Sequence, residues 1–356
     1  MSANKKTMKF LAMVLVFLLV VLSSGCSSAE KSDTSNTEAV TEEAVAVDTT
    51  PAGLKVALLV NGPISDAGWN ASAYDGLMAV KEKFGFETSY LQVKSLSDCE
   101  QELRNYADAG YDIIFAHGFE YQDPAGKIAD EYPDTHFIIT SGSKAVGDNV
   151  SPIIFLEEEG YYVMGMAAAE LTKTNKIGLI GGMEIPSLVY PWKGFELGVA
   201  ETNPDAKVVT TWVGSWDDIG KAKESALAQI EAGYDVVFIS ANQAGLGGIQ
   251  ACAEKNVWTF GAYGEQLQLA PKQMIGELLL DIPKAFTDVT QQIVDGTFKG
   301  GIYSPGVAQG AVVFHWNDEL INGNAELEAI RTKGQEMMEK ISSGEKKIRS
   351  FSLEIQ

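Results

Sequence analysis

Two stretches of this 356-residue chain occur twice in similar form, and this repetition limits the possible folds more than any other feature of the sequence. Residues 55–60 (KVALLV) resemble residues 176–181 (KIGLIG), 121 positions later. Residues 109–115 (AGYDIIF) resemble residues 232–238 (AGYDVVF), 123 positions later. Repetition at a nearly constant spacing indicates a duplicated structural unit. We therefore expect two lobes of similar architecture.

Each half of the chain predicts the same order of strands and helices. An apolar, β-branched strand comes first, and a strand that follows a Gly-Tyr-Asp tripeptide comes later. Strands of continuous apolar character that alternate with amphipathic helices are typical of parallel sheets covered by helices on both faces. The predicted fold class is therefore α/β, with two doubly wound parallel-sheet lobes. In the first half, the remaining expected elements are a helix over 70–84, a strand over 86–93, a helix over 98–110 and a strand near 135–140. In the second half, they are a helix over 190–202, a strand over 206–213, a helix over 217–232 and a strand near 257–262.

We expect the two lobes to exchange segments of the chain. Ligands bind beyond the carboxyl ends of the strands in sheets of this kind, so two facing lobes place a binding site in the cleft between them. Candidate crossovers between the lobes lie near residues 150–160, 262–282 and 300–310. The N-terminal lobe is predicted to comprise residues 54–155 and a returning segment of about 265–305, and the C-terminal lobe residues 156–264 and about 306–356.

The first 25 residues predict an export signal that ends at a lipidation site. Lys5, Lys6 and Lys9 form a basic region, and residues 10–22 are thirteen consecutive apolar residues. This run is shorter than the roughly 20 residues that a membrane-spanning helix needs. The small residues that follow end in Gly-Cys26, which is the pattern that lipoprotein signal peptidase cleaves. We expect Cys26 to become the lipidated N-terminus. An uncleaved anchor is the alternative.

Residues 26–53 are expected to form the lipidated cysteine and a flexible acidic tether. This segment is rich in Ser, Thr, Glu and Ala and contains no aromatic residue, so it cannot bury enough apolar surface to offset the entropy of ordering. The whole chain has 27 Lys and Arg against 48 Asp and Glu, a net charge of −21. Such a charge argues against nucleic acid as a partner. The predicted location is the extracytoplasmic face of the cell membrane, with the lipid on Cys26 as the anchor.

Neither a metal centre nor an enzyme is expected. The chain contains three His and three Cys, without Cys-x-x-Cys or His-Glu-x-x-His spacing, and we predict no metal and no cofactor. No ordered Ser/His/Asp set on a nucleophile elbow is present. Cys99 and Cys252 fall in predicted helices of opposite lobes, where we expect two buried thiols. The sequence therefore favours a binding protein.

The segment after the first strand carries side chains suited to a planar ligand. It reads Asp66-Ala-Gly-Trp69-Asn70 and leads into a predicted helix. A tryptophan at a helix start, away from the apolar stripe, offers a face for stacking, and an asparagine amide offers one donor group and one acceptor. A helix cap with a packed tryptophan is the alternative for the same residues.

These residues resemble the first ligand-binding motif of the basic membrane protein family, the PnrA-like purine-nucleoside-binding lipoproteins of ABC transporters. The resemblance extends over essentially all of residues 54–350. It implies a type I periplasmic-binding-protein fold with a three-crossover hinge, a purine nucleoside or nucleobase as ligand, and ABC permease and ATPase subunits as partners. It also implies that Asp66, Trp69 and Asn70 contact the ligand, with Trp69 in the stacking position. The other matching segments are Tyr74-Asp-Gly76, Gly118-Phe119, residues 132–137, Glu159-Gly-Tyr161, residues 176–182, Ile185-Pro186 and Gly194-Phe195.

One departure from the family pattern favours a nucleobase over a nucleoside. Family members that hold ribose carry a Gly-Val-Asp-x-Asp-Gln segment, and the corresponding residues here are Gly261-Ala-Tyr263-Gly-Glu265-Gln266. Tyr263 stands in place of a carboxylate, so an acceptor for sugar hydroxyls is exchanged for an aromatic face. We expect a free purine base or another planar heterocycle, and a ribonucleoside remains the alternative.

The remaining candidate residues follow from their positions. Trp192 follows a proline just before a predicted helix, a setting similar to that of Trp69. Trp216 either faces the cleft or packs behind aspartate caps, and His117 either donates to the ligand or is structural. The run 157–159, three glutamates, is expected to be a solvated face, with a partner for a purine N–H as the alternative. The predicted ligand-binding set is Asp66, Trp69, Asn70, His117, Gly118, Phe119, Trp192, Trp216, Asn242, Gln243, Tyr263 and Glu265.

The predicted function is that of an extracytoplasmic solute-binding lipoprotein of an ABC importer. A monomer would bind a purine nucleobase or nucleoside between its lobes and deliver it to a membrane permease. Ligand would favour closure of the lobes only as far as it binds the closed form better. Two alternatives stay open: a sensing lipoprotein of the same fold that signals to a membrane receptor, and an importer component for another planar heterocycle such as a flavin.

Overall fold

Strands and helices alternate through the part of the chain that the computed structural model describes, residues 53–354. The predicted leader (1–25), Cys26 and nearly all of the predicted tether (26–53) lie outside the described residues. Within residues 53–354, no helix is long and apolar enough to cross a membrane. No group of His, Cys, Asp and Glu in this range is arranged to hold a metal ion.

The first lobe contains a five-stranded parallel sheet. Side chains of its interior strand β1 (Lys55–Val60) alternate between two hydrophobic clusters: Val56, Leu58 and Val60 belong to one, and Ala57 and Leu59 to the other. All five are fully buried, which explains why this strand is continuously apolar. The strand order is β2 (Glu87–Gln92), β1 (Lys55–Val60), β3 (Ile113–His117), β4 (His136–Thr140) and β5 (Val150–Ile153).

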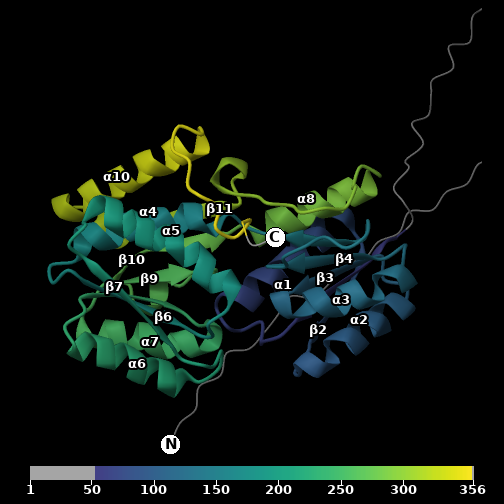
Figure 1. Cartoon of the computed structure of the whole chain (residues 1–356), viewed down its shortest axis with the longest axis horizontal. Helices are drawn as coiled ribbons and strands as arrows, with labels where there is room; N and C mark the ends of the chain where they lie inside the picture. The colour runs from purple at the N-terminus through teal and green to yellow at the C-terminus, as the bar shows by residue number, and fades with distance from the viewer. Residues whose placement is uncertain (1–52, 355–356) are drawn as a thin grey trace, which may run out of the picture. The chain divides into compact units, whose positions relative to one another are not determined.

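Helices cover both faces of this first sheet. Helices α1 (Trp69–Phe84) and α8 (Ile282–Val294) share one hydrophobic cluster with the sheet. Helices α2 (Cys99–Asp108) and α3 (Gln122–Ile128) share the other cluster, and Figure 1 shows them beside β2 and β3. The periodicity of α1 accounts for its orientation, because Ala73, Leu77 and Val80 recur at helical spacing and are all buried.

The second lobe repeats the start of this pattern and then departs from it. Strands β7 (Lys207–Trp212), β6 (Lys176–Gly181) and β8 (Val236–Ser240) form a parallel sheet in that order. A bridge between Val236 and Trp258 connects it to a second ladder, which ends in an antiparallel strand. The strands of that ladder are β9 (Thr259–Ala262), β10 (Met274–Leu280) and β11 (Val312–Trp316).

Helices also cover both faces of the second lobe. Figure 1 shows α4 (Glu157–Leu171) and α5 (Pro186–Thr202) on one side of β6, with α6 (Ile219–Glu231) and α7 (Asn242–Lys255) on the other. Helix α10 (Ala325–Ser342) follows the short helix α9 (Asp318–Ile321) and packs on α4. The 3₁₀ helices are η1 (Leu96–Asp98), η2 (Phe119–Tyr121), η3 (Ala129–Glu131), η4 (Leu267–Leu269) and η5 (Val307–Gln309). The predicted α/β fold class is confirmed.

The returning segment is shorter than predicted. We expected residues 265–305 in the N-terminal lobe, but β10 pairs with β9 and β11 and so belongs to the second lobe. Its residues are almost all buried and apolar, which suits an interior strand. Helix α8 does return to the first lobe, where Phe286 stacks on Phe115 with ring centroids 3.9 Å apart.

Two of the segments that cross between the lobes run side by side. The backbone N–H of Ile154 donates to the carbonyl of Tyr303 at 2.9 Å, and that of Leu156 donates to Pro305 at 3.0 Å. The third crossing lies between β10 and α8, at Asp281, whose carboxylate caps α8 by accepting from the N–H of Lys284. Short, hydrogen-bonded crossings of this kind are suited to act as a hinge.

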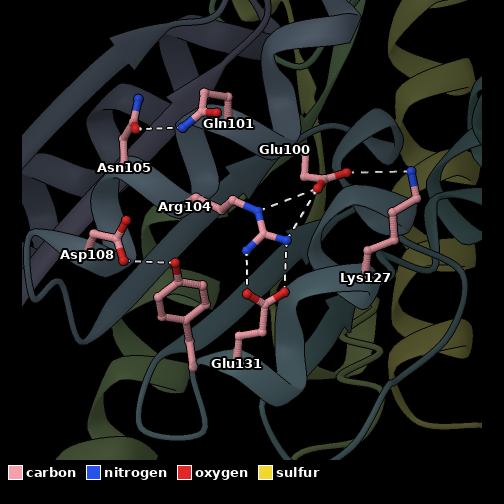
Figure 2. Close-up of polar contacts among 8 residues, drawn as sticks. Glu100, Gln101, Arg104, Asn105, Asp108, Lys127 and Glu131 are labelled. Carbon is pink, nitrogen blue, oxygen red and sulfur yellow. Dashed lines mark hydrogen bonds and ion pairs between the residues drawn. The ribbon is translucent and has the colours of Figure 1, made fainter.

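A polar network lies on α2 and the segment after α3, away from the sheet (Figure 2). The two terminal nitrogens of Arg104 donate to the carboxylate of Glu131 at 2.7 and 2.8 Å. Glu100 lies within 3.4 Å of Arg104 and 3.6 Å of Lys127. Because these groups are largely exposed, each pair contributes roughly 0–1 kcal/mol. The lobe therefore depends on its two buried clusters far more than on this network.

Candidate ligand-binding site

A cavity with about 480 Å³ of empty space lies at the strand ends of both lobes. Its walls come from the segments after β1, β3, β4, β6, β7, β8 and β9 and from the first residues of α1 and α4. This is where ligands bind in doubly wound sheets. The lining residues are Asn61, Trp69, Gly118, Phe119, Glu120, Ser141, Glu157, Ile185, Ser187, Leu188, Trp216, Ser240, Asn242 and Tyr263.

Trp69 is held in place by the carboxylate of Asp66. The backbone N–H groups of Gly68, Asn70 and Ala71 donate to Asp66 at 2.9–3.0 Å, so this side chain caps the start of α1. The Asn70 amide also donates to Asp66, at 2.8 Å. Asp66 and Asn70 are fully buried and do not line the cavity, whereas we expected both to contact the ligand. Their geometry assigns them to positioning Trp69.

His117 packs against the ring of Trp69. Its ring stacks on Trp69 with centroids 4.0 Å apart, and Nε2 lies 2.9 Å from the Trp69 carbonyl oxygen. Burial lowers the pKa of His117 to about 3, so the ring is neutral. A carbonyl can only accept, so Nε2 carries the proton and Nδ1 accepts from the Thr140 hydroxyl at 2.8 Å. Both ring nitrogens of His117 are thus occupied, and Trp69, whose ring His117 supports, lines the cavity.

The loops around the cavity use an uncommon backbone conformation. Among the described residues, six that are not glycine have positive φ, and three of these, Ser141, Asn242 and Tyr263, line the cavity. Ala67, beside Trp69, is a fourth. Such conformations cost on the order of 1 kcal/mol or more each and persist where the surrounding structure imposes them, often at ligand sites. The strain is concentrated where each strand end turns into the cavity.

Glu157, Tyr161 and Tyr263 form a chain of hydrogen bonds on the second-lobe side. The Tyr161 hydroxyl donates to the Tyr263 hydroxyl at 2.8 Å, and Tyr263 donates to Glu157 Oε2 at 2.9 Å. Glu157 is 5% exposed. Burial raises its pKa to about 8, although the Tyr263 hydrogen bond opposes this, so Glu157 is protonated at neutral pH. The Tyr263 and Trp69 rings also form a T-shaped pair, with centroids 5.5 Å apart.

The glutamate run 157–159 is not the solvated face that we expected. Glu157 and Glu158 are both buried. Glu158 accepts from the backbone N–H of Ser352 at 3.0 Å and from the Ser350 hydroxyl at 3.1 Å. The C-terminal segment therefore covers this end of α4, which the charge pattern alone did not indicate. Of the three, Glu157 reaches the cavity.

The two candidate tryptophans of the second lobe have different surroundings. Trp216 lines the cavity and lies over Gly182, where any larger residue would collide with the indole ring. Trp192 is 3% exposed and stacks on Trp212, with ring centroids 5.2 Å apart. It lies within α5, which begins at Pro186, so our expectation of a position before a helix was wrong. The preset φ of proline suits the first helical position, which accounts for the earlier start.

Six of the twelve predicted residues line the cavity and six do not. Gln243 lies in the first turn of α7 without lining the cavity, and Glu265 lines a different depression beside Asp75 and Asp281. The six that line it are Trp69, Gly118, Phe119, Trp216, Asn242 and Tyr263; the six that do not are Asp66, Asn70, His117, Trp192, Gln243 and Glu265.

Sequence reasoning left eight lining residues out of the predicted set. Asn61, Ser141 and Ser240 lie at or directly after the ends of apolar strands. Ligands bind beyond the carboxyl ends of such strands, and applying this strand-end rule to each strand would have identified the three residues. Glu120 follows β3 by three positions and is a weaker case of the same signal. The others, which depend on tertiary packing, are Glu157, Ile185, Ser187 and Leu188.

The fold and the cavity define a two-lobed solute-binding protein. A solute-binding protein of an ABC transporter system from Aeropyrum pernix K1 has the same fold, with a TM-score of 0.73 and 24% sequence identity. The alignment covers 83% of this chain and 93% of that chain. The periplasmic-binding-protein type of fold is thereby confirmed.

The chain belongs to the Bmp family, the PnrA-like ABC transporter substrate-binding proteins, whose family model matches residues 54–347. A purine-binding protein of Brucella abortus is 31% identical over 262 residues, which are 73% of this chain and 74% of that protein. The nucleoside-binding protein BmpA of a Lactococcus lactis ABC transporter is 31% identical over 271 residues, 70% of this chain and 77% of that protein. The protein is therefore an ABC transporter substrate-binding protein and not an enzyme.

Proposed function

We propose that this substrate-binding protein captures a purine base, or a planar heterocycle of similar size, in the cavity between its lobes. The observation that carries the proposal is the fixed stacking surface. Trp69 is backed by His117, and Trp216 enters the same cavity from the other lobe. Aromatic side chains from two sides suit a flat ring, because stacked or edge-on aromatic pairs gain about 0.5–1.5 kcal/mol beyond burial. The purine- and nucleoside-binding relatives support the same class of ligand.

Tyr263 supports a base over a nucleoside. Its hydroxyl is occupied by Tyr161 and Glu157, and its ring forms a T-shaped pair with Trp69. No ionised carboxylate is provided at position 263 itself to accept from sugar hydroxyls. A nucleoside is the ligand that would contradict this part of the proposal.

Capture would depend on closure of the lobes about the crossing segments near Ile154, Asp281 and Tyr303. Closure is favoured only by the difference in affinity between the closed and open forms. A ligand that stacks on Trp69 and also contacts Trp216 and Asn242 has partners on both lobes, which supplies that difference. We propose that the closed monomer then delivers its ligand to the permease of an ABC importer.

The anchor belongs to the same proposal. Cys26 would carry the lipid, and residues 27–53 would tether the folded part to the extracytoplasmic face of the membrane. Expression with a radiolabelled fatty acid tests this, since Cys26→Ser should abolish labelling while leaving the folded part intact. Labelling that persists in the variant would contradict the assignment.

Ligand class is tested by thermal denaturation of the chain lacking residues 1–25, followed by calorimetry. The compounds are adenine, guanine, hypoxanthine, xanthine, uracil, adenosine, guanosine, inosine and riboflavin. A ligand present at 100 times its Kd stabilises the folded state by about 2.7 kcal/mol, so even moderate affinity raises the midpoint visibly. We expect a purine base to bind and Trp69→Ala to weaken it. Tighter binding of nucleosides would overturn the preference for a base, and no binding by any compound would overturn the purine assignment.

A further inference from the structure

The cavity is lined by two glutamates and by no basic side chain. Among its fourteen lining residues, Glu120 and Glu157 are acidic, and none is Lys, Arg or His. The two carboxyl groups come from different elements, Glu120 from η2 in the first lobe and Glu157 from the start of α4 in the second. A ligand that enters this cavity therefore meets a carboxyl group from each lobe and no cationic side chain.

The two carboxyl groups differ in how well they are satisfied. Glu157 already accepts from the Tyr263 hydroxyl at 2.9 Å. In contrast, Oε2 of Glu120 is buried and accepts no hydrogen bond of normal geometry, although the Asn61 amide lies near enough to lower the pKa of this carboxyl group. A buried acceptor without a partner costs roughly 1–3 kcal/mol, and a charged one costs more. Because the Glu120 side chain lines the cavity, its rotation would present this oxygen to a donor group of the ligand.

Gly118 is what allows Glu120 to take this position. The Glu120 carboxylate folds back over Gly118, where a β-carbon would collide with Oε2. Gly118 also has a φ of 143°, a region that other residues rarely adopt. Burial raises the pKa of Glu120, while its own backbone N–H and the Asn61 amide lower it. The absence of a side chain at Gly118 thus leaves room for this carboxylate beside the cavity.

We infer that Glu120 determines ligand specificity by accepting a hydrogen bond from an N–H or O–H group of an uncharged heteroaromatic ligand stacked on Trp69, and by excluding phosphorylated forms of that ligand. The inference rests on the proposed function, since it assigns a role within the same cavity. A phosphate group would find no cationic partner on the cavity wall and would lie in the field of a carboxylate. The donor comes either from the purine ring or from a sugar hydroxyl.

Calorimetry with two matched series of compounds tests the inference: adenine, adenosine and AMP, and guanine, guanosine and GMP. For the wild-type chain without residues 1–25, we expect each nucleotide to bind about 100-fold or more weakly than its base or nucleoside. Glu120→Gln keeps the size of the side chain but replaces one acceptor oxygen with a donor NH₂ group. We expect it to weaken the best ligand about 10-fold or more.

Comparing the base with the nucleoside identifies the ligand group that donates a hydrogen bond to Glu120. A loss of affinity for the free base assigns the hydrogen bond to the purine ring, and a loss for the nucleoside alone assigns it to a sugar hydroxyl. Glu120→Gln should also reduce the discrimination against the nucleotide, because it removes the repelling charge. Glu87→Gln, an exposed residue of the same lobe, is the matched control and should change neither quantity.

Three results would overturn the inference. Unchanged affinity in Glu120→Gln, with binding still weakened by Trp69→Ala, would refute the role of Glu120 and leave the proposed function standing. A wild-type nucleotide affinity equal to that of the nucleoside would refute the exclusion of phosphates, and this measurement needs no variant to fold. No binding of any of the six compounds would overturn both the inference and the purine assignment.

Discussion

The two lobes share their first strands but not the residues that follow them. In the first lobe, β1 leads to Asp66, whose carboxylate caps α1 so that Trp69 lines the cavity. In the second lobe, β6 leads to α5 without a side-chain cap, and the nearest tryptophan, Trp192, lies inside the helix and is buried. Residues inside a strand must be apolar because helices cover both faces of the sheet. Residues after a strand lie in a connecting loop and are less restricted. The similarity of the lobes therefore lies in their first strands, and the residues that follow those strands differ.

A second contrast concerns the ionisable group that each lobe buries beside the cavity. His117 in the first lobe is neutral because burial lowers its pKa to about 3. Glu157 in the second is neutral because burial raises its pKa to about 8. A lowered histidine pKa reduces stability as the pH falls below about 6.5, and a raised glutamate pKa reduces stability as the pH rises above about 4.5. The two lobes are thus sensitive to opposite changes of pH.

The largest expected effect comes from Trp192→Ala. Trp192 is 3% exposed and packs on Trp212, so its removal leaves a cavity in the second lobe. We expect the free energy of unfolding to fall by about 3–5 kcal/mol, measured by urea denaturation. Affinity of the protein that remains folded should be unchanged. A stable variant that no longer binds ligand would show that Trp192, like Trp69, contacts the ligand.

Glu157→Gln tests the contrast in pH sensitivity. Between about pH 4.5 and about pH 8, Glu157 is ionised in the unfolded chain but protonated in the folded protein, so the free energy of unfolding falls as the pH rises. Glutamine does not ionise, so the variant lacks this loss. At about 1.4 kcal/mol for each unit of pKa difference, we expect the variant to gain on the order of a few kcal/mol relative to wild type at about pH 9. It should gain little at about pH 5. Urea denaturation of both proteins at both pH values measures this. If the variant and wild type differed in free energy of unfolding by the same amount at about pH 5 and about pH 9, the raised pKa of Glu157 would be contradicted.

Trp69→Ala should affect binding more than folding. Trp69 is partly exposed and lies on the cavity, so loss of stacking is expected to weaken ligand binding by about 1–3 kcal/mol, measured by calorimetry. Trp216→Ala should have an effect of the same kind from the second lobe. If Trp216→Ala weakened binding and Trp69→Ala did not, the main stacking surface would belong to the second lobe.

The smallest expected effect is that of Asp66→Ala on stability. It removes the cap of α1 and should lower the free energy of unfolding by about 0.5–2 kcal/mol. The matched change in the second lobe is Glu184→Ala, an exposed residue just before α5 that caps nothing, and it should stay within about 0.5 kcal/mol of wild type. Equal losses of free energy of unfolding in the two variants would show that side chains cap the first helix in both lobes.

Part of the candidate site was accessible from the sequence. Trp69 and Asn242 flank strand ends, and the strand-end rule predicts that such residues lie near a ligand. The sequence could not show that Trp69 lines the cavity whereas Asp66 does not, because both residues occur in one motif. Only the structure shows that the Asp66 carboxylate accepts from backbone N–H groups at the start of α1. Trp192 was misplaced because a proline within a helix resembles a proline before one in the sequence.

The sequence by itself determined the family, the α/β class and the duplicated strands, because these follow from local patterns of apolar residues and from motifs of adjacent residues. Only the tertiary structure decided that β10 joins the second sheet, that Glu157 and Tyr263 share a hydrogen bond across 106 positions of the chain, and that a Glu120 oxygen is buried without a partner. Burial and hydrogen bonding between distant residues depend on how the whole chain is packed, and no local pattern records them.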